Sequence, residues 1–236
     1  MCTSIVKNGN KTIVGFNLDI LGMQHRVNAN ADHVFIEILD EQNDWLPLFG
    51  VNDRGDFVGM PTCHPYDPRS DQSHSEQISV LMADIDLLLK KRTFEELKAL
   101  AEQGAIYSFP QVTWQMQITD RRGNVLRHTP GQWCEYLEKP AYCVMTNFSP
   151  WKEQRNEHPW SGADRYAVAE KMLKDSNADF NVSDAFAVLK ATAQEVCPTV
   201  VSLVYDATEH TAYWCENRQW DKINCQKLKE CENKNE

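Results

Sequence analysis

The sequence predicts an α+β protein, a four-layer αββα sandwich of two stacked antiparallel sheets with a pair of helices outside each sheet. Strand-type apolar runs occupy the start, the middle and the end of the chain. Helical spacing of apolar residues occupies two separate stretches between them, and each stretch holds two predicted helices. The order is therefore strands, two helices, strands, two helices, strands, which favours sheet meanders with helices inserted in pairs.

Residues 1–19 predict a β-hairpin. Two apolar-rich runs flank Asn8-Gly9, a dipeptide that tolerates the positive φ angles of a type I′ turn. With a two-residue loop Cys2 faces Gly15, and the alternation of side chains places the Cys2 thiol on the same face as Asn17 and Asp19. A three-residue loop would shift this register by one residue, and Cys2 would then no longer share a face with Asn17 and Asp19.

The next part of the chain predicts an antiparallel meander followed by two helices. Strands are expected at residues 34–39 and 45–51, and a turn at 52–55 leads into a strand at 57–60. Apolar residues then recur at helical spacing over 76–103. Thr93 and Glu96 form a capping box that begins the second helix of this stretch. These helices are expected to cover one face of a sheet.

Strands return over residues 111–119, 125–128, 133–137 and 142–146, and two helices follow. Ser161, with Asp164 three residues later, predicts the start of the first helix and places Arg165 in its first turn. A cation there opposes the helix dipole, so an anionic partner is expected, and an exposed arginine is the alternative. The second helix begins at Ser183, and closing strands are expected at 199–205, 211–215 and about 219–228.

Composition predicts one domain over residues 1–236, because no linker or low-complexity tract interrupts the chain. The net charge of −10 argues against nucleic-acid and anionic-membrane partners. The chain has no signal-peptide pattern and no membrane-spanning apolar run, so a cytoplasmic location is expected. Its eight cysteines include no Cys-x-x-Cys pair, which argues against a disulfide framework.

Residues 64–74 contain two histidines and two aspartates, but their spacing matches no metal-ligand template. A solvated loop is the better interpretation of this segment. The sequence therefore predicts neither a metal site nor a cofactor.

Cys2 is the first candidate for chemistry. Methionine aminopeptidase generally removes Met1 when the next residue is small, and this removal would give Cys2 a free α-amine. An amine with a pKa of about 7.7 to 8.0 would then share one residue with a thiol of pKa about 8.5, so it could act as the base for that thiol. The alternative is that Met1 stays and Cys2 is a small apolar residue at a strand start.

Five segments, in the same order around an N-terminal cysteine, resemble the choloylglycine hydrolase and penicillin V acylase family of linear-amide hydrolases in the N-terminal-nucleophile superfamily. The resemblance covers most of the chain. The Met-Cys-Thr-Ser start is similar to the family's processed terminus, and Gly-Phe-Asn-Leu-Asp at 15–19 is similar to its Gly-Arg-Asn-x-Asp signature. The other matches are Gly-Val-Asn-Asp-Arg-Gly at 50–55, Val-Met-Thr-Asn at 144–147 with Pro150, and Asp-Arg-Tyr at 164–166.

The resemblance implies an N-terminal-nucleophile-like fold and a hydrolase that cleaves a linear N-acyl C–N bond through a Cys2 thioester. It implies that Asp19 holds the α-amine, that Asn147 donates to the oxyanion and that Arg165 orients the amine end of the site. The substrate is expected to be a small N-acyl amide with an apolar acyl group. Its expected contacts are Phe16, Asn17, Met23, Met60 and Phe148.

Three departures from the family pattern leave alternatives open. Phe16 replaces the family's first arginine, and only eighteen positions separate Asn147 from Arg165. The segment Met60-Pro61-Thr62-Cys63 lacks the Leu-Asn pair of many members, so it identifies no second oxyanion donor, although backbone N–H groups other than that of Pro61 could serve. An acyltransferase that uses the same thioester, or a catalytically silent ligand-binding homologue, therefore remains an alternative. The sequence also leaves a homo-oligomer open.

Overall fold

Two antiparallel sheets form the centre of the protein. The computed structural model describes residues 1–64, 77–109, 112–150 and 160–230. The first sheet has the order β14-β1-β2-β15-β16-β17, with β14 Tyr142–Met145, β1 Cys2–Asn8, β2 Thr12–Asp19, β15 Thr199–Asp206, β16 Thr211–Glu216 and β17 Asn224–Lys227. The second has the order β13-β12-β11-β6-β5-β4-β3, with β13 Trp133–Leu137, β12 Val125–Thr129, β11 Met116–Thr119, β6 Phe57–Gly59, β5 Trp45–Asn52, β4 His33–Leu39 and β3 His25–Asn30.

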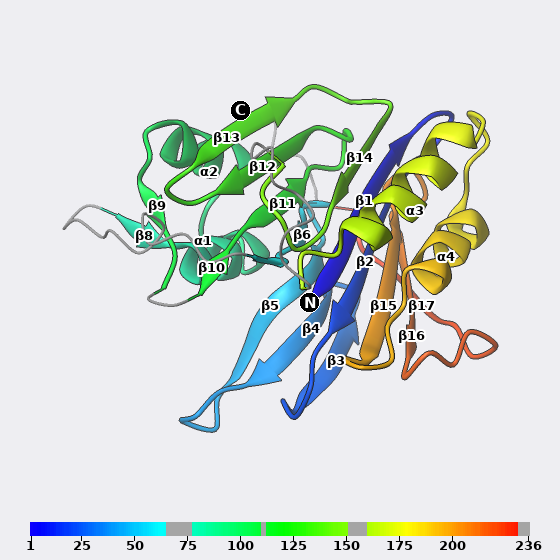
Figure 1. Cartoon of the computed structure of the whole chain (residues 1–236), viewed down its shortest axis with the longest axis horizontal. Coiled ribbons are helices and arrows are strands. Elements are labelled where there is room, and N and C mark those ends of the chain that lie inside the picture. Colours follow the sequence, from blue (N-terminus) through cyan, green and yellow to red (C-terminus); the bar gives the residue numbers. More distant parts are fainter. Residues whose placement is uncertain (65–76, 110–111, 151–159, 231–236) are drawn as a thin grey trace.

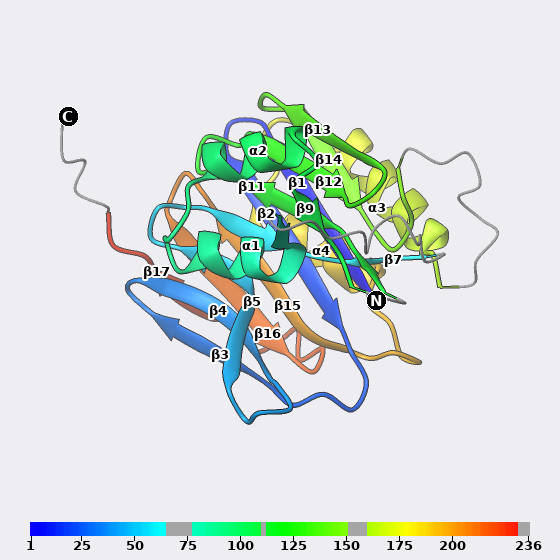
Figure 2. The same cartoon turned by 90° about the vertical axis from the view of Figure 1, so that its left-hand side faces the viewer.

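Helices cover the outer face of each sheet, as the sequence predicts. Helices α3 (Ala163–Asp175) and α4 (Val182–Ala191) pack on strands of the first sheet, and α1 (Val80–Leu88) and α2 (Phe94–Glu102) pack on the second. Figure 1 shows the two helix pairs on opposite sides of the strands, and Figure 2 shows α1 and α2 in front of them. The four-layer αββα architecture is thereby confirmed.

Two short strand pairs complete the described topology. Strand β7 (Thr62–Cys63) pairs with β10 (Thr113–Trp114), and β8 (Ile78–Ser79) runs parallel to β9 (Ile106–Tyr107). Within the part of the chain that the structure describes, no helix combines the length and the apolar character that a bilayer crossing requires.

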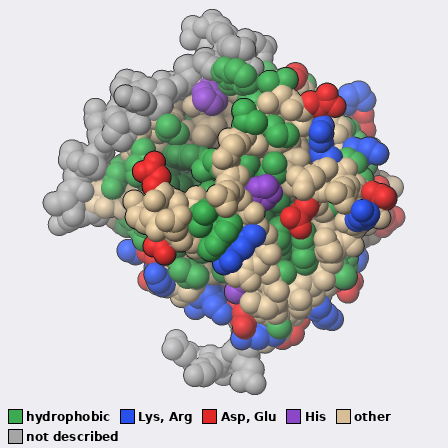
Figure 3. Space-filling model, turned by 90° about the horizontal axis from the view of Figure 1, so that it is seen from below, with side chains coloured by type: hydrophobic (Ala, Val, Ile, Leu, Met, Phe, Trp, Pro, Cys, Tyr) green, Lys and Arg blue, Asp and Glu red, His purple; other side chains and the backbone are tan. Residues whose placement is uncertain are grey.

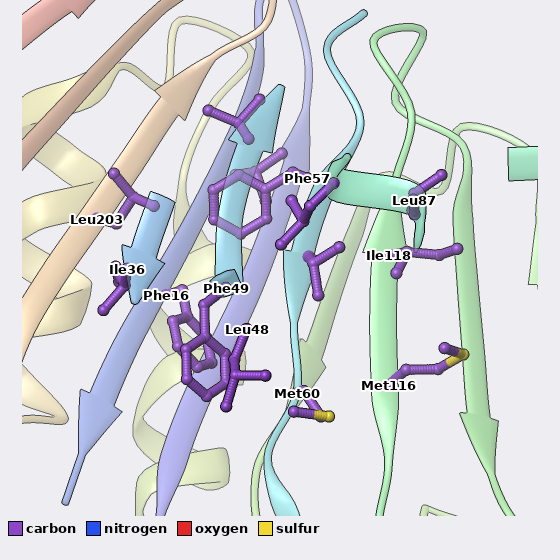
Figure 4. Close-up of a cluster of buried hydrophobic side chains, with 14 of the residues drawn as sticks. Phe16, Ile36, Leu48, Phe49, Phe57, Met60, Leu87, Met116, Ile118 and Leu203 are labelled. Atoms are coloured by element: carbon purple, nitrogen blue, oxygen red, sulfur yellow. The ribbon is translucent and has the colours of Figure 1, made fainter. Parts of the chain in front are cut away.

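The two sheets pack face to face around a continuous apolar core. The rings of Phe16 and Phe49 stack with their centroids 5.0 Å apart, one from each sheet. Gln117 donates to the Ser4 hydroxyl across the same interface at 2.8 Å. Figure 4 shows Phe16, Phe49 and Met60 within this cluster of buried side chains. The face of β1 that carries Ser4 therefore points at the second sheet. Cys2 lies two residues before Ser4, so its side chain also points between the sheets.

The predicted register of the first hairpin is wrong. The loop spans residues 9–11, Asn8 pairs with Thr12, and Cys2 pairs with Leu18 and not with Gly15. Cys2 therefore shares a face with Leu18, while Asn17 and Asp19 lie on the opposite face of the ribbon. The reason is tertiary: the Asn8 side chain donates to the carbonyls of residues 123 and 140, and the Asn10 N–H donates to the carbonyl of residue 178.

The start of α3 also differs from the prediction. Gly162, with φ +70°, is the N-cap and has no side-chain cap bond, so Ser161 does not cap the helix. Helix α4 is capped by Asn181 and begins at Val182, close to the predicted Ser183. The capping box of Thr93 and Glu96 is confirmed.

Some strands also differ from the prediction. The run predicted over 111–119 is divided into β10 and β11, and β3 was not predicted. Most of the segment weighed as a metal site, residues 65–74, lies outside the described residues.

Candidate functional site

Cys2 begins β1, a strand that lies between β14 and β2. Its side chain is 3% exposed and lines a cavity between the sheets. Burial raises the pKa of this thiol to about 11, and the N-terminal amine and Arg165 act in the opposite direction. In the Met1-bearing chain the thiol is therefore protonated at neutral pH.

The main-chain nitrogen of Cys2 is held by Asn147. It donates to Asn147 Oδ1 at 2.8 Å, and Arg165 Nη2 donates to the same oxygen at 2.8 Å. Two donors therefore converge on one side-chain oxygen, which assigns the orientation of the Asn147 amide. Its nitrogen faces the other way, toward Thr62, and donates to the Thr62 carbonyl at 2.7 Å and to the Thr62 hydroxyl at 2.9 Å.

Arg165 links β1 to α3. Its Nη1 donates to the Cys2 carbonyl at 2.6 Å and to the Thr3 hydroxyl at 2.8 Å, and lies 3.7 Å from a carboxylate oxygen of Asp19. Asp19 is the predicted anionic partner. The Arg165 side chain is buried, so the alternative of an exposed arginine is wrong. This cation, placed in the first turn of α3, is compensated by Asp19 and by carbonyl and hydroxyl oxygens.

Asp19 ends β2 and is fully buried. Its carboxylate accepts a bond from the Thr199 hydroxyl at 2.6 Å and one from Gln194 Nε2 at 2.6 Å. Burial raises the pKa of Asp19 to about 6, and the bond from Thr199, Arg165 and the bond from Gln194 lower it. Thr199 and Gln194 were not predicted, since they lie far along the chain and match none of the motifs considered.

Met1 lies beside Asp19 in this form of the chain. The Met1 amine donates to the main-chain oxygen of Asp19 at 2.7 Å, and the Asp19 N–H donates to the Met1 carbonyl at 2.9 Å. The structure thus brings Cys2, Asp19, Asn147 and Arg165 together. Asp19 lies on the opposite face of the hairpin from Cys2 and contacts Arg165 there.

A cavity of about 220 Å³ adjoins Cys2. Met23 lies at its wall and is 50% exposed, so the cavity reaches the surface there. Thr62, Asp19 and Asp40 are the polar residues of a wall that is otherwise almost entirely apolar, made by Met1, Leu18, Ile20, Met23, Ile38, Leu39, Leu46, Leu48, Phe49, Leu81 and Trp114. Such a cavity suits a flexible apolar group next to a thiol.

The turns at residues 20–24 and 40–44, which flank this cavity, lie at the lower end of the molecule in Figure 1. Figure 3 looks at that end and shows hydrophobic side chains exposed among polar and charged ones. Leu21 and Met23 are among the exposed apolar side chains of the protein. The surface around the cavity is thus partly apolar.

Four of the predicted substrate contacts lie elsewhere. Phe16 and Met60 are fully buried in the core between the sheets, and Phe148 is buried against the ring of Tyr166. Asn17 donates to the main chain and side chain at the end of α4 and accepts a bond from Ser202. Of the five side chains, only Met23 lines the cavity beside Cys2.

The described residues contain no group of three or more His, Cys, Asp or Glu side chains arranged to hold a metal ion. The cluster of Cys2, Asp19, Asn147 and Arg165 offers a thiol, a carboxylate, an amide and a guanidinium beside an apolar cavity.

Comparison with solved structures identifies this fold in known hydrolases. A mutant of conjugated bile acid hydrolase from Clostridium perfringens aligns over 97% of this chain and 92% of its own, with a TM-score of 0.65 and 12% identity. A second variant of that hydrolase aligns over 96% and 92%, with a TM-score of 0.62 and 12% identity. Penicillin V acylase from Agrobacterium tumefaciens aligns over 91% and 83%, with a TM-score of 0.59 and 14% identity.

No protein-family model and no curated protein matches the chain. The structural likeness extends over nearly the whole chain at low identity, so it identifies a shared fold, the N-terminal-nucleophile hydrolase-like sandwich. The family resemblance noted in the sequence thus agrees with the structural neighbours.

Proposed function

We propose that this chain is a hydrolase of linear amides that uses Cys2 as an N-terminal nucleophile after Met1 is removed. The structural neighbours are named as a hydrolase of conjugated bile acids and an acylase of penicillin V, and they support an amide hydrolase as the activity class. The observation that carries the proposal is the 2.8 Å bond from the Cys2 nitrogen to Asn147, since this nitrogen would become the catalytic amine.

Removal of Met1 would convert the peptide nitrogen of Cys2 into an α-amine at the same position. Asn147 Oδ1 would accept a hydrogen bond from this amine, and the positive charge of Arg165 nearby would help to keep the amine neutral and able to act as a base. The Asp19 main-chain N–H, which now bonds to Met1, would be released. The Met1-bearing chain would be inactive, because its peptide nitrogen has no lone pair available for a proton.

In the acylation step, the amine would take the thiol proton and the Cys2 sulfur would attack the amide carbonyl carbon. The carbonyl electrons would move to oxygen and form an oxyanion, to which Asn147 Nδ2 would donate. The oxyanion would then collapse, the C–N bond would break, and the α-ammonium group would return its proton to the leaving amine. The products of this step are a thioester on Cys2 and a free amine.

In the deacylation step, water would attack the thioester carbonyl while the α-amine takes one of its protons. The C–S bond would break, the proton would return to the sulfur, and a carboxylic acid would leave. Asp19 would position the amine through both steps, and Thr199 and Gln194 would hold the Asp19 carboxylate. Arg165 would hold Asn147 and the Cys2 carbonyl.

The substrate would be a small N-acyl amide whose apolar acyl chain enters the cavity beside Cys2. Met23 is the substrate contact that we retain from the sequence predictions, because it lines this cavity. Phe16, Asn17, Met60 and Phe148 support the fold around the site through their packing and hydrogen bonds.

The test is hydrolysis of p-nitroanilides with acyl chains from acetyl to dodecanoyl by the purified protein, after mass spectrometry of its N-terminus. We expect a mature chain that begins with Cys2 and hydrolyses the longer substrates. Cys2→Ala should abolish release of the aniline, and the exposed Cys225→Ala should leave it unchanged. Hydrolysis by Cys2→Ala at the wild-type rate would overturn the mechanism.

Ligand binding without catalysis is the second candidate, and one observation favours it. Phe16 stands where the family has its first arginine, and it is fully buried and stacked on Phe49, so this position itself supplies no cation to the nucleophile. A mature protein that keeps Met1, binds fatty acids and releases no aniline would favour this function. Addition of an amine such as glycine in the assay would reveal acyl transfer by a new N-acyl product.

A further inference from the structure

The orientation of the Asn147 amide leaves its nitrogen on the side of Thr62. Oδ1 accepts from both the Cys2 nitrogen and Arg165, which a donor nitrogen could not do, so Nδ2 must face Thr62. Thr62 lines the same cavity as Cys2. The fully buried Asn147 amide is therefore a direct neighbour of Thr62, whose residue lies on the wall where a substrate carbonyl would meet the sulfur.

The Thr62 hydroxyl has a proton that does not go to Asn147. Its oxygen accepts from Asn147 Nδ2 at 2.9 Å, so its own O–H must point in another direction. Within the described residues, which stop at residue 64 and resume at 77, its partner is His64 Nε2 at 3.4 Å, a contact longer than an ordinary O–H hydrogen bond. An acceptor that enters the cavity at ordinary hydrogen-bond distance would therefore compete with His64 for this proton.

The position of Thr62 is set by its backbone. Thr62 pairs with Trp114 in the ladder between β7 and β10, and its carbonyl accepts from Asn147 Nδ2 at 2.7 Å. Pro61, the preceding residue, has no N–H and cannot donate to an oxyanion. Among the residues of this turn, Thr62 is the one that combines a donor, an anchored backbone and a place on the cavity wall.

We propose that the Thr62 hydroxyl is the second donor to the oxyanion, beside the Asn147 amide. The proposal rests on the amide hydrolase function, in which the carbonyl oxygen becomes negatively charged as the Cys2 sulfur attacks. In that state Asn147 Nδ2 exchanges its bond to the Thr62 hydroxyl oxygen for one to the oxyanion, and the Thr62 O–H turns to the same oxygen. Two fixed donors then stabilise the charge at low cost in reorganisation.

Thr62→Val and Thr62→Ser are the matched variants. Valine keeps the shape of threonine and the backbone carbonyl that holds Asn147 but removes the hydroxyl, whereas serine keeps the hydroxyl. We expect Thr62→Val to lower kcat about 100-fold with KM within about twofold, since the lost bond forms only in the transition state. Thr62→Ser should stay within about threefold of the wild type.

A second measurement does not depend on turnover. Octanal adds to the Cys2 thiol, the S–C bond forms and the thiol proton passes to the aldehyde oxygen, so the resulting hemithioacetal presents an oxygen to the same donors. Octanal affinity, measured by protection of Cys2 from iodoacetamide, should fall at least about tenfold in Thr62→Val and be restored in Thr62→Ser. The alkylation rate of Cys2 without octanal should be the same in all three proteins.

The outcomes separate the two proposals. If Thr62→Val keeps both kcat and octanal affinity within twofold of the wild type, or if valine and serine lower them equally, the role of Thr62 is overturned. If the wild type releases no aniline while octanal affinity still depends on the hydroxyl, the donor stands and the hydrolase function fails. Thermal unfolding of the variants verifies that each is folded.

Discussion

The guanidinium of Arg165 occupies the space that a side chain on Gly162 would need. A Cβ built on Gly162 collides with the Arg165 guanidinium, and the glycine has a φ of +70°. The N-cap of α3 is therefore a glycine both because of its backbone and because Arg165 folds back over it toward Cys2 and Asn147. This relationship connects the start of a helix to the geometry of the proposed catalytic group.

Gly162→Ala is expected to displace Arg165 and thereby to lower kcat/KM about 100-fold or more, because the Cys2 carbonyl and Asn147 lose their donor. Gly104→Ala is the matched control, since Gly104 has a similar φ of +67° and a Cβ built on it meets nothing within 4 Å. Backbone strain should cost each variant about 1 kcal/mol of stability, and Gly162→Ala should lose more because the buried bonds of Arg165 are also broken. Equal kcat/KM values for the two variants would contradict this role of Arg165.

The Thr199 hydroxyl is expected to tune the acid limb of the pH profile. It donates to the Asp19 carboxylate, and a bond to the ionised form lowers a pKa, so Thr199→Val should raise the pKa of Asp19. The carboxylate would then be protonated at a higher pH, and the acid limb of kcat/KM should move to higher pH. Thr199→Ser should leave the limb in place, and an unmoved limb in the valine variant would show that Asp19 does not control it.

Asp84 is expected to destabilise the protein as pH rises. It is fully buried in α1, neither carboxylate oxygen has a hydrogen-bond partner among the residues that the structure describes, and burial raises its pKa well above the ordinary value. The folded state thus binds a proton that the unfolded state releases above about pH 4, so stability falls as pH rises from there toward the folded pKa.

Asp84→Asn cannot titrate, so it should be more stable than the wild type at pH 8, by about 1–3 kcal/mol, and the difference should shrink toward pH 4. Urea unfolding at several pH values measures it. Asp221→Asn, at an exposed position, is the control and should change stability by less than about 0.5 kcal/mol. A difference that does not depend on pH would refute the assignment of a protonated Asp84.

The cavity is expected to set the acyl-chain preference. Each methylene that enters it should add about 0.8 kcal/mol, or about fourfold in kcat/KM, until the cavity of about 220 Å³ is filled. Leu48→Trp should fill part of this space and move the optimum to shorter chains, while acetyl substrates react at an unchanged rate. An optimum that stays the same in Leu48→Trp would mean that the acyl chain binds elsewhere.

The sequence by itself determined the layers of this protein. Local patterns such as the capping box at Thr93 and the alternating run at residues 34–39 depend on interactions within one element, and these elements formed where they were expected. The sequence also raised an anionic partner for Arg165, because a cation at a helix N-terminus opposes the helix dipole, but it left an exposed arginine open, and the structure identified Asp19.

Tertiary structure alone decided the hairpin register and the cavity. The register follows from bonds that Asn8 and Asn10 make to distant turns, which no local turn preference contains. Phe16 and Leu48 have the same apolar character in the sequence, yet one is enclosed in the core and the other lines the cavity, since that difference depends on how the two sheets stack. The same holds for Thr62, which reaches Asn147 only because β7 is anchored to β10.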